Sequence, residues 1–311
     1  MDEVRSAYRA AEGFEAVLAE ELARKGVVVS RWHGPLALSG DGPVEAAWAL
    51  DVWRSPVLIP VGSIKAGADA LRAIQRNWDC LAVAHFRRAA LIGQRLPPIK
   101  AREFGAGSVA PDAKLGGWTL LAPDLMLASA EKSSPFLGAV PAFAEDHIGP
   151  PSRAYLKLWE ACLRFGAWPG PGEVCFDLGA SPGGWTWAIA ERGAAVVAVD
   201  RAPLEPRVAA MAGVSLRQGS AFSMAPEPCD WLFSDIIAYP DRLLELVRAW
   251  IAAGVVRRIV CTVKFQGATD HDTAEAFAAI QGGRLQHLSV NKHELTFMWR
   301  RPDQAGSGLS P

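Results

Sequence analysis

The stretch Asp177-Leu178-Gly179-Ala180-Ser181-Pro182-Gly183-Gly184-Trp185 decides the fold expected of this chain. It follows an apolar run that starts at Val174, and helical spacing resumes from Gly183. A strand that leads through a glycine-rich turn into a helix brings the backbone close to a bound ligand. The stretch therefore predicts a cofactor-binding turn at the edge of an open α/β sheet.

The spacing of the small residues in this turn disfavours a nicotinamide dinucleotide. Gly179-x-Ser181-x-x-Gly184 departs from G-x-G-x-x-G, because a serine stands where the pyrophosphate needs bare backbone. Asp200 ends the next apolar run, 23 residues after Asp177, where a carboxylate can bind both hydroxyls of a ribose. Either aspartate alone could equally be a helix cap. Together they predict a site for another nucleotide-like cofactor.

The C-terminal half alternates short apolar runs with helical stretches. This alternation is typical of a doubly wound α/β domain with a mostly parallel sheet. The last two apolar runs leave no room for a helix between them, so we expect a hairpin and an antiparallel edge strand. The expected strands cover residues 174–177, 195–200, 231–235, 256–264, 285–290 and 295–299.

The chain is long enough for two domains. It has 311 residues, half of them hydrophobic, which allows a core in each. A proline- and glycine-rich stretch without regular periodicity separates the two halves. The expected parts are a smaller N-terminal α/β module over residues 1–132, a linker over 133–151, the C-terminal domain over 152–302 and a disordered tail over 303–311.

The N-terminal module combines helical and strand patterns. Residues 13–25 have helical spacing, residues 27–29 are strand-like, and residues 118–130 alternate as one strand. Basic side chains gather around Phe86 and a turn at Pro97-Pro98, where they form either a phosphate-contacting surface or a solvated loop. These side chains are Arg87, Arg88, Arg95, Lys100 and Arg102.

Composition narrows the class of protein. A formal net charge of −1 argues against non-specific coating of nucleic acid, and no stretch is long and apolar enough to span a membrane. We therefore expect a soluble cytoplasmic protein. Cysteines and histidines lack ligand spacing, which predicts no metal and buried, reduced thiols. The cysteines are Cys80, Cys162, Cys175, Cys229 and Cys261.

The glycine-rich stretch resembles the cofactor loop D-L-G-x-x-P-G-G-W/F of the FtsJ-like ribose 2′-O-methyltransferases. The resemblance implies S-adenosyl-L-methionine as cofactor and a class I, Rossmann-like methyltransferase domain with a seven-stranded sheet. It also implies which residues bind the cofactor. They are Asp177, Gly179, Ala180, Ser181, Pro182, Gly183, Gly184, Trp185, Asp200, Ser220 and Asp235.

The family also has a catalytic lysine, aspartate, lysine, glutamate tetrad, and each member has a matching position here. The matching residues are Lys157, Asp235, Lys264 and Glu294. Lys157 precedes the first strand, whereas Asp235 and Lys264 end strands and Glu294 begins the last one. Taken singly, Lys157 could be solvated helix surface and Glu294 a solvent-facing strand position.

Methyl transfer to a ribose hydroxyl is an in-line displacement in which a weak nucleophile must be oriented and activated. A lysine suits this task. Its ordinary pKa of about 10.4 falls beside another cation in a partly desolvated site, while nearby carboxylates act in the opposite direction. We expect Lys264 to be the base or only to orient the hydroxyl. Asp235 would orient Lys264, Lys157 would add positive charge, and Glu294 would position lysine and ribose.

Within the family the chain is most similar to the RlmM type, which methylates a cytidine of 23S ribosomal RNA and carries an N-terminal RNA-binding THUMP domain. The similarity implies a THUMP-like module and an RNA partner, with Arg153 and Lys292 as further phosphate contacts. Two features depart from this type: the N-terminal half is shorter, and Ser220 replaces the usual aspartate near the adenine. Three alternatives are another structured RNA such as tRNA, a silent RNA- or ribosome-binding fold, and a nicotinamide-dependent oxidoreductase.

Overall fold

The computed structural model describes residues 3–302, which form two compact units. Unit 1 contains residues 3–103 and 110–142, and unit 2 contains residues 104–109 and 143–302. The boundary after residue 142 falls inside the stretch expected to be a linker, and residues 133–142 belong to unit 1. The tail expected over residues 303–311 lies outside the described residues.

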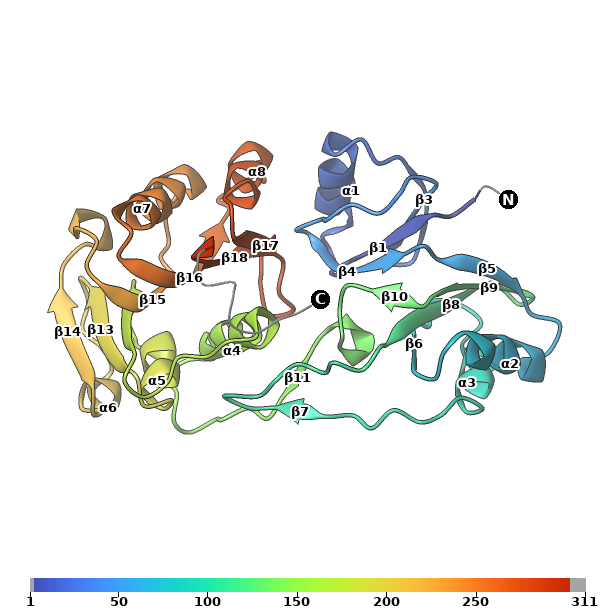
Figure 1. Ribbon diagram of the computed structural model, residues 1–311, viewed down its shortest axis with the longest axis horizontal. Helices are drawn as coiled ribbons and strands as arrows, with labels where there is room; N and C mark the ends of the chain where they lie inside the picture. Colours follow the sequence, from blue (N-terminus) through green and yellow to red (C-terminus); the bar gives the residue numbers. More distant parts are fainter. Residues whose placement is uncertain (1–2, 303–311) are drawn as a thin grey trace. The chain divides into compact units, whose positions relative to one another are not determined.

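Unit 1 contains two main sheets, shown in blue to green in Figure 1. The five-stranded sheet has the order β10-β4-β1-β3-β2, and α1 lies beside it. The second sheet has the order β5-β9-β8-β6, and it is accompanied by α2 and α3. The elements are β1 (Ser6–Ala10), α1 (Glu15–Arg24), β2 (Val29–His33), β3 (Leu36–Ser39), β4 (Ala49–Arg54), β5 (Val57–Pro60), α2 (Ile64–Ile74), β6 (Trp78–Cys80), α3 (Phe86–Gly93), β8 (Gly116–Ala122), β9 (Leu125–Ser129) and β10 (Glu131–Lys132).

Three expectations for this unit need correction. The expected strand over residues 118–130 is a hairpin of β8 and β9, because Pro123 and Asp124 form the turn between them. The segment around Arg87 begins as helix α3 and not as a loop. The expected strand over residues 27–29 is mostly coil, and β2 starts only at Val29.

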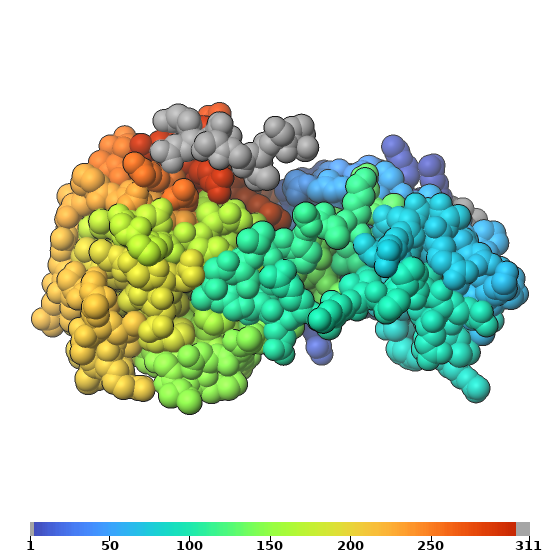
Figure 2. Space-filling model, turned by 60° about the horizontal axis from the view of Figure 1, so that its bottom comes forward, coloured from blue at the N-terminus to red at the C-terminus, as the bar shows by residue number. Residues whose placement is uncertain are grey.

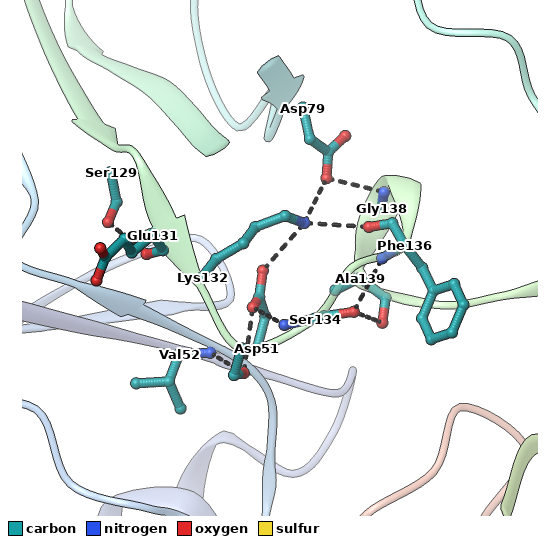
Figure 3. Close-up of polar contacts among 11 residues, drawn as sticks. Asp51, Val52, Asp79, Ser129, Glu131, Lys132, Ser134, Phe136, Gly138 and Ala139 are labelled. Atoms are coloured by element: carbon teal, nitrogen blue, oxygen red, sulfur yellow. Dashed lines mark hydrogen bonds and ion pairs between the residues drawn. The ribbon is translucent and has the colours of Figure 1, made fainter. Parts of the chain in front are cut away.

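A buried ionic cluster, which we call the Lys132 centre, joins three strands of unit 1 (Figure 3). It consists of Lys132 on β10, Asp51 on β4 and Asp79 on β6. The Lys132 side chain is 1% exposed, and its ammonium lies 3.3 Å from Asp51 Oδ2 and 3.2 Å from Asp79 Oδ2. It also donates to the carbonyl of Phe136, and Asp79 accepts from the Gly138 amide. Strands of both main sheets therefore meet at one charged group.

Unit 2 is built on a seven-stranded sheet of order β14-β13-β12-β15-β16-β18-β17. The first five of these strands are mutually parallel, whereas β18 pairs antiparallel with both of its neighbours. The strands are β12 (Val174–Leu178), β13 (Ala195–Asp200), β14 (Val214–Gln218), β15 (Cys229–Ser234), β16 (Val256–Lys264), β17 (Gly283–Gln286) and β18 (Glu294–Arg300).

The expected antiparallel edge strand is wrong in its position. The antiparallel strand is β18, and it lies inside the sheet between β16 and β17. Residues 294–299 of β18 are all buried, whereas β17 is short and half of it is solvent-accessible. The more apolar strand of the hairpin therefore takes the interior position, because only there is it covered on both edges.

Helices cover both faces of this sheet, with α4, α5 and α6 on one side and α7 and α8 on the other (Figure 1). Figure 2 brings forward the side of α4 to α6, which is yellow-green to yellow. In residues 3–302 no helix is long and apolar enough to cross a membrane. The helices are α4 (Tyr155–Phe165), α5 (Gly184–Ala190), α6 (Pro206–Ala209), α7 (Pro240–Ala253) and α8 (His271–Ala278).

Two short strands, β7 (Glu103–Phe104) and β11 (Ala142–Phe143), pair where the chain passes from one unit to the other. All five cysteines are free thiols, but Cys80 is exposed and so corrects the expectation that every thiol is buried. Cys80 lies at the end of β6, whose short length leaves its last residue at the surface.

Candidate active site

A pocket of about 510 Å³ opens at the carboxyl edge of the parallel strands of unit 2. Open α/β sheets bind ligands at this edge, because the loops diverge there. The lining comes from the ends of β12, β13, β14, β15 and β16 and from the N-terminal part of α7. It comprises Ala154, Gly179, Ser181, Pro182, Val199, Asp200, Arg201, Gly219, Ser220, Ala221, Phe222, Asp235, Ile236, Ile237, Arg242 and Lys264.

The turn after β12 forms one wall of the pocket. Gly179 has a φ of +78°, and a Cβ at this position would lie 2.7 Å from Cγ1 of Ile236, so both conformation and space require glycine. The Asp200 carboxylate is fixed by two backbone amides, with Oδ2 3.0 Å from the Ser181 nitrogen and Oδ1 2.9 Å from the Ala202 nitrogen. A carboxylate held by two amides keeps lone pairs available to a ligand.

Other residues of the same turn lie below the pocket and not in its lining. Trp185 is 3% exposed, and its ring nitrogen donates to the carbonyl of Ala154 at 2.8 Å. A Cβ on Gly184 would lie 2.7 Å from the Ser152 hydroxyl, so this glycine allows α5 to pack closely. Ala180, Gly183 and Asp177 are also buried. A direct role for these five residues in cofactor binding stays a prediction.

Asp177 is the buried acid of this turn. Burial raises the pKa of its carboxyl from 3.8 to about 7, and Asp235 and Asp200 add to the rise. The Thr186 hydroxyl opposes the rise by donating to Oδ2 at 2.6 Å. An acid with this pKa is partly protonated near neutral pH, so Asp177 acts as a hydrogen-bonding core residue more than as a fixed charge.

The four predicted catalytic side chains come together, and two of them, Asp235 and Lys264, line the pocket. The Lys264 ammonium lies 2.9 Å from Asp235 Oδ1 and donates to the Asp235 carbonyl at 2.6 Å. The Lys157 ammonium lies 2.5 Å from Glu294 Oε1 and 3.6 Å from Asp235 Oδ1. Two cations and two carboxylates therefore alternate within ion-pair distance. We call Lys157, Asp235, Lys264 and Glu294 the tetrad.

Four separate elements position the tetrad. Lys264 and Glu294 are direct partners in the register of β16 and β18, and Asp235 follows β15. Lys157 reaches the group from α4, and its side chain is only 17% exposed. Glu294 is 5% exposed. The alternative in which these two residues are solvated surface positions is therefore wrong.

Residues 150–270 match the FtsJ-like methyltransferase family. This match coincides with the glycine-rich turn, the pocket and three of the four tetrad residues. Most of unit 2 therefore matches an FtsJ-like methyltransferase domain, and we call this unit the FtsJ-like domain.

Several relatives that resemble this chain share one name. Ribosomal RNA large subunit methyltransferase M of Halorhodospira halophila is 40% identical over 160 residues, which cover 49% of this chain and 47% of that protein. Its namesake in Methylococcus capsulatus is 32% identical over 199 residues, covering 62% and 56%. A solved ribosomal RNA methyltransferase of Plasmodium falciparum is 17% identical, with a TM-score of 0.35, covering 48% and 96%. The chain spans about half the length of the curated relatives it matches.

The FtsJ-like domain also has pocket residues that the sequence did not identify. The Arg242 guanidinium lies 3.9 Å from the centre of the Phe222 ring, and both side chains line the pocket beside Ser220. Arg242 is on α7, far along the chain from Phe222, and no motif marks it. Thr262 was also missed, and its hydroxyl donates to Asp235 Oδ1. The one sequence feature that indicates a role for Thr262 is its position two residues before Lys264, which places both side chains on the same face of the strand.

The candidate phosphate contacts lie in both units. In unit 1, Arg87 is exposed on α3, whereas Arg88 is half-buried and donates to the carbonyl of Val61. Arg95, Lys100 and Arg102 are exposed after α3. In the FtsJ-like domain, Lys292 is exposed two residues before Glu294, and Arg153 forms a two-bond ion pair with Glu145. Contact of these residues with RNA stays a prediction.

Proposed function

We propose that this protein transfers a methyl group from S-adenosylmethionine to a ribose 2′-OH of RNA. The observation that carries the proposal is the tetrad, whose four charged side chains come together beside a pocket at the carboxyl edge of the sheet. A fold that only binds RNA gains nothing from two desolvated lysines held by two carboxylates, since burying charges costs free energy.

The pocket fits the proposed cofactor. Its volume of about 510 Å³ suits a nucleoside-sized ligand, and the bare backbone at Gly179 admits close approach. Asp200 would hold the ribose hydroxyls of the cofactor. Ser220 replaces an acid near the adenine, so Ala221 and Phe222 would hold the base mainly through backbone and apolar contacts. When bound, S-adenosylmethionine supplies an activated methyl group.

The residues of the tetrad would prepare the RNA hydroxyl. Lys264 lines the pocket and would orient the 2′-OH, and its amine, when unprotonated, would receive the hydroxyl proton as the oxygen takes the methyl group. Asp235 holds Lys264 by its side chain and its carbonyl, which fixes the direction of the amine. Lys157 and Glu294 form the second ion pair and would hold the ribose. Orientation of this kind supplies much of the rate gain in a displacement reaction.

We further propose a cytidine of 23S ribosomal RNA as the target, modified in the cytoplasm before full ribosome assembly. The names of the relatives support this substrate. Unit 1 would be a THUMP-like RNA-binding module, with the exposed cations after and on α3 as phosphate contacts. The single-stranded target nucleotide would enter the edge of the FtsJ-like domain, because a 2′-OH is reached most easily in unpaired RNA.

The test uses RNA from a strain that lacks this gene. Purified full-length protein is incubated with labelled S-adenosylmethionine and with either 23S ribosomal RNA or bulk tRNA, and the products are digested to nucleosides. The proposal predicts label in 2′-O-methylcytidine from 23S RNA only. Label in tRNA would replace the proposed substrate. Cofactor binding without label in any RNA would favour the silent binding protein.

A further inference from the structure

The loop between β17 and β18, residues 287–293, leads directly into Glu294 of the tetrad. Lys157, the ion-pair partner of Glu294, is on α4. Glu160 lies one helical turn after Lys157, so its side chain is on the same side of α4. One further carboxylate, on the helix that carries Lys157, therefore contacts the loop that leads into Glu294.

Glu160 is a fully buried carboxylate with a complete set of donors. It is 0% exposed and lies 2.8 Å from Nε of Arg164, which is itself 2% exposed. Its two oxygens also accept from the Ser289 amide, at 3.1 and 3.0 Å, and Oε2 accepts from the Ser289 hydroxyl at 2.5 Å. A buried charge is tolerated only with such compensation, so this contact ties the loop firmly to α4.

Packing and hydrogen bonds connect the rest of the loop to Ser289 and to the start of β18. Leu288 is 0% exposed in the core of the domain. The Asn291 side chain donates to the backbone carbonyl of Glu294 and to the hydroxyl of Thr296. The His287 ring contacts the carbonyl of Lys292 at 3.0 Å. A displacement of Ser289 would therefore be transmitted to Glu294.

We propose that Glu160 is a positioning residue for methyl transfer: by clamping Ser289 it fixes the loop 287–293 and holds Glu294 against Lys157. The inference rests on the proposed function, but the clamp itself is a property of the fold. In the described part of the chain, Glu160 has no hydrogen bond or ion pair to a tetrad side chain, so its effect on the reaction passes through the loop and α4. Misplacement of a reacting group by about 1 Å can cost on the order of 100-fold in rate.

The test removes the clamp without leaving a lone buried charge. In the double variant Glu160→Met with Arg164→Met, both charges are replaced by side chains of similar volume, so the domain is expected to fold. We expect kcat for RNA methylation to fall about 10- to 100-fold, with the KM for RNA and the affinity for S-adenosylmethionine within about threefold of the wild type. Ser289→Ala should lower kcat by a smaller factor than the double variant does. Ser289→Thr, which keeps the hydroxyl, should have a kcat close to that of the wild type.

Ser215→Ala is the control for Ser289→Ala, because it also removes a hydroxyl that donates a hydrogen bond, here to the carbonyl of Val196, but on β14, away from the tetrad. An unchanged kcat in the double variant would overturn the proposal. So would a fall in kcat matched by equal losses of cofactor affinity and unfolding midpoint. Hydrogen exchange of amides 287–293 tests the clamp separately: it must accelerate in the double variant. If even the wild type is inactive, the proposed function fails, and this exchange measurement alone decides the clamp.

Discussion

At the scale of single residues, Asp177 shows how burial changes a side chain that a motif marks as charged. Its folded-state pKa of about 7 lies above the ordinary value of 3.8, chiefly because the carboxyl is buried. Between these two pH values the folded protein holds a proton that the unfolded chain has released. Folding is therefore favoured at the lower pH, and this contribution to stability is lost as the pH rises through about 7.

The prediction concerns Asp177→Asn, which keeps an acceptor for Thr186 but cannot ionise. Relative to the wild type, the free energy of unfolding of the variant should rise between pH 4 and pH 8, by on the order of 4 kcal/mol. Urea unfolding of both proteins without cofactor, at several pH values, measures this difference. Asp112→Asn, at an exposed position, controls for the loss of one carboxylate. A difference that does not change with pH would contradict the account.

The tetrad residues could be predicted because the sequence resembles the FtsJ-like family, and the positions of Asp235 and Lys264 at strand ends support that prediction. Asp235 and Lys264 follow buried strands, and strand ends meet at one edge of a parallel sheet. Arg242 and Glu160 could not be predicted in this way. Their partners, Phe222 and Ser289, are distant in sequence, and only the packing of helices against the sheet brings them together.

At the scale of elements, the Lys132 centre holds together strands that short-range pairing alone leaves weak. Strand β10 has only two residues and pairs with β4, while β6 has three and pairs with β8. The buried Lys132 ammonium on β10 links this strand to β4 through Asp51 and to β6 through Asp79 (Figure 3). Loss of that charge would leave Asp51 and Asp79 without their cationic partner.

Lys132→Met should therefore destabilise unit 1 by about 3 to 5 kcal/mol, because it breaks a buried ion pair from one side. The matched control is Lys65→Met, which removes an exposed ammonium paired with Asp69 on α2 and should cost less than about 1 kcal/mol. Denaturant unfolding followed by tryptophan fluorescence compares the two. Equal stability of the two variants would show that the centre contributes little.

Most strand positions in unit 2 followed from apolar periodicity, but sheet order did not. The strand expected over residues 285–290 is β17 over Gly283–Gln286, and β14 was not among the expected strands. The hairpin of β17 and β18 was expected because no helix fits between its strands, and the structure contains that hairpin. Which strand of the hairpin lies inside the sheet depends on the burial of β18 on both faces and edges, a tertiary property. The turn at Pro123 and Asp124 was a local signal that we overlooked, and it divides β8 from β9.

At the scale of the whole molecule, the formal charge of −1 requires that any RNA contact be local. Unit 1 offers a local group of cations in the segment that starts with α3. We predict that Arg87→Ala combined with Lys100→Ala weakens binding of 23S ribosomal RNA. The plot of log affinity against log salt should become less steep, by about 1 to 2 in the magnitude of its slope. Cofactor affinity should not change.

Arg5→Ala combined with Arg31→Ala provides the control, because these arginines are also exposed in unit 1 but lie outside the segment. Filter binding at several salt concentrations measures both pairs. Equal effects of the two double substitutions would mean that the cations of the segment that starts with α3 contribute to RNA binding only through net charge. The sequence predicted two domains and the FtsJ-like fold of the C-terminal one, because that family has a specific cofactor loop. No comparable motif marks unit 1.

Methyl transfer by the wild type and by Lys264→Ala shows whether the tetrad catalyses the proposed reaction. Both full-length proteins are supplied with labelled S-adenosylmethionine and RNA from the strain lacking this gene, with Arg248→Ala, an exposed residue on α7, as control. We expect label on a ribose 2′-oxygen with wild type and control, and a rate about 100- to 10,000-fold lower with Lys264→Ala. Wild-type rates in Lys264→Ala, or label on a base, would contradict the proposed function.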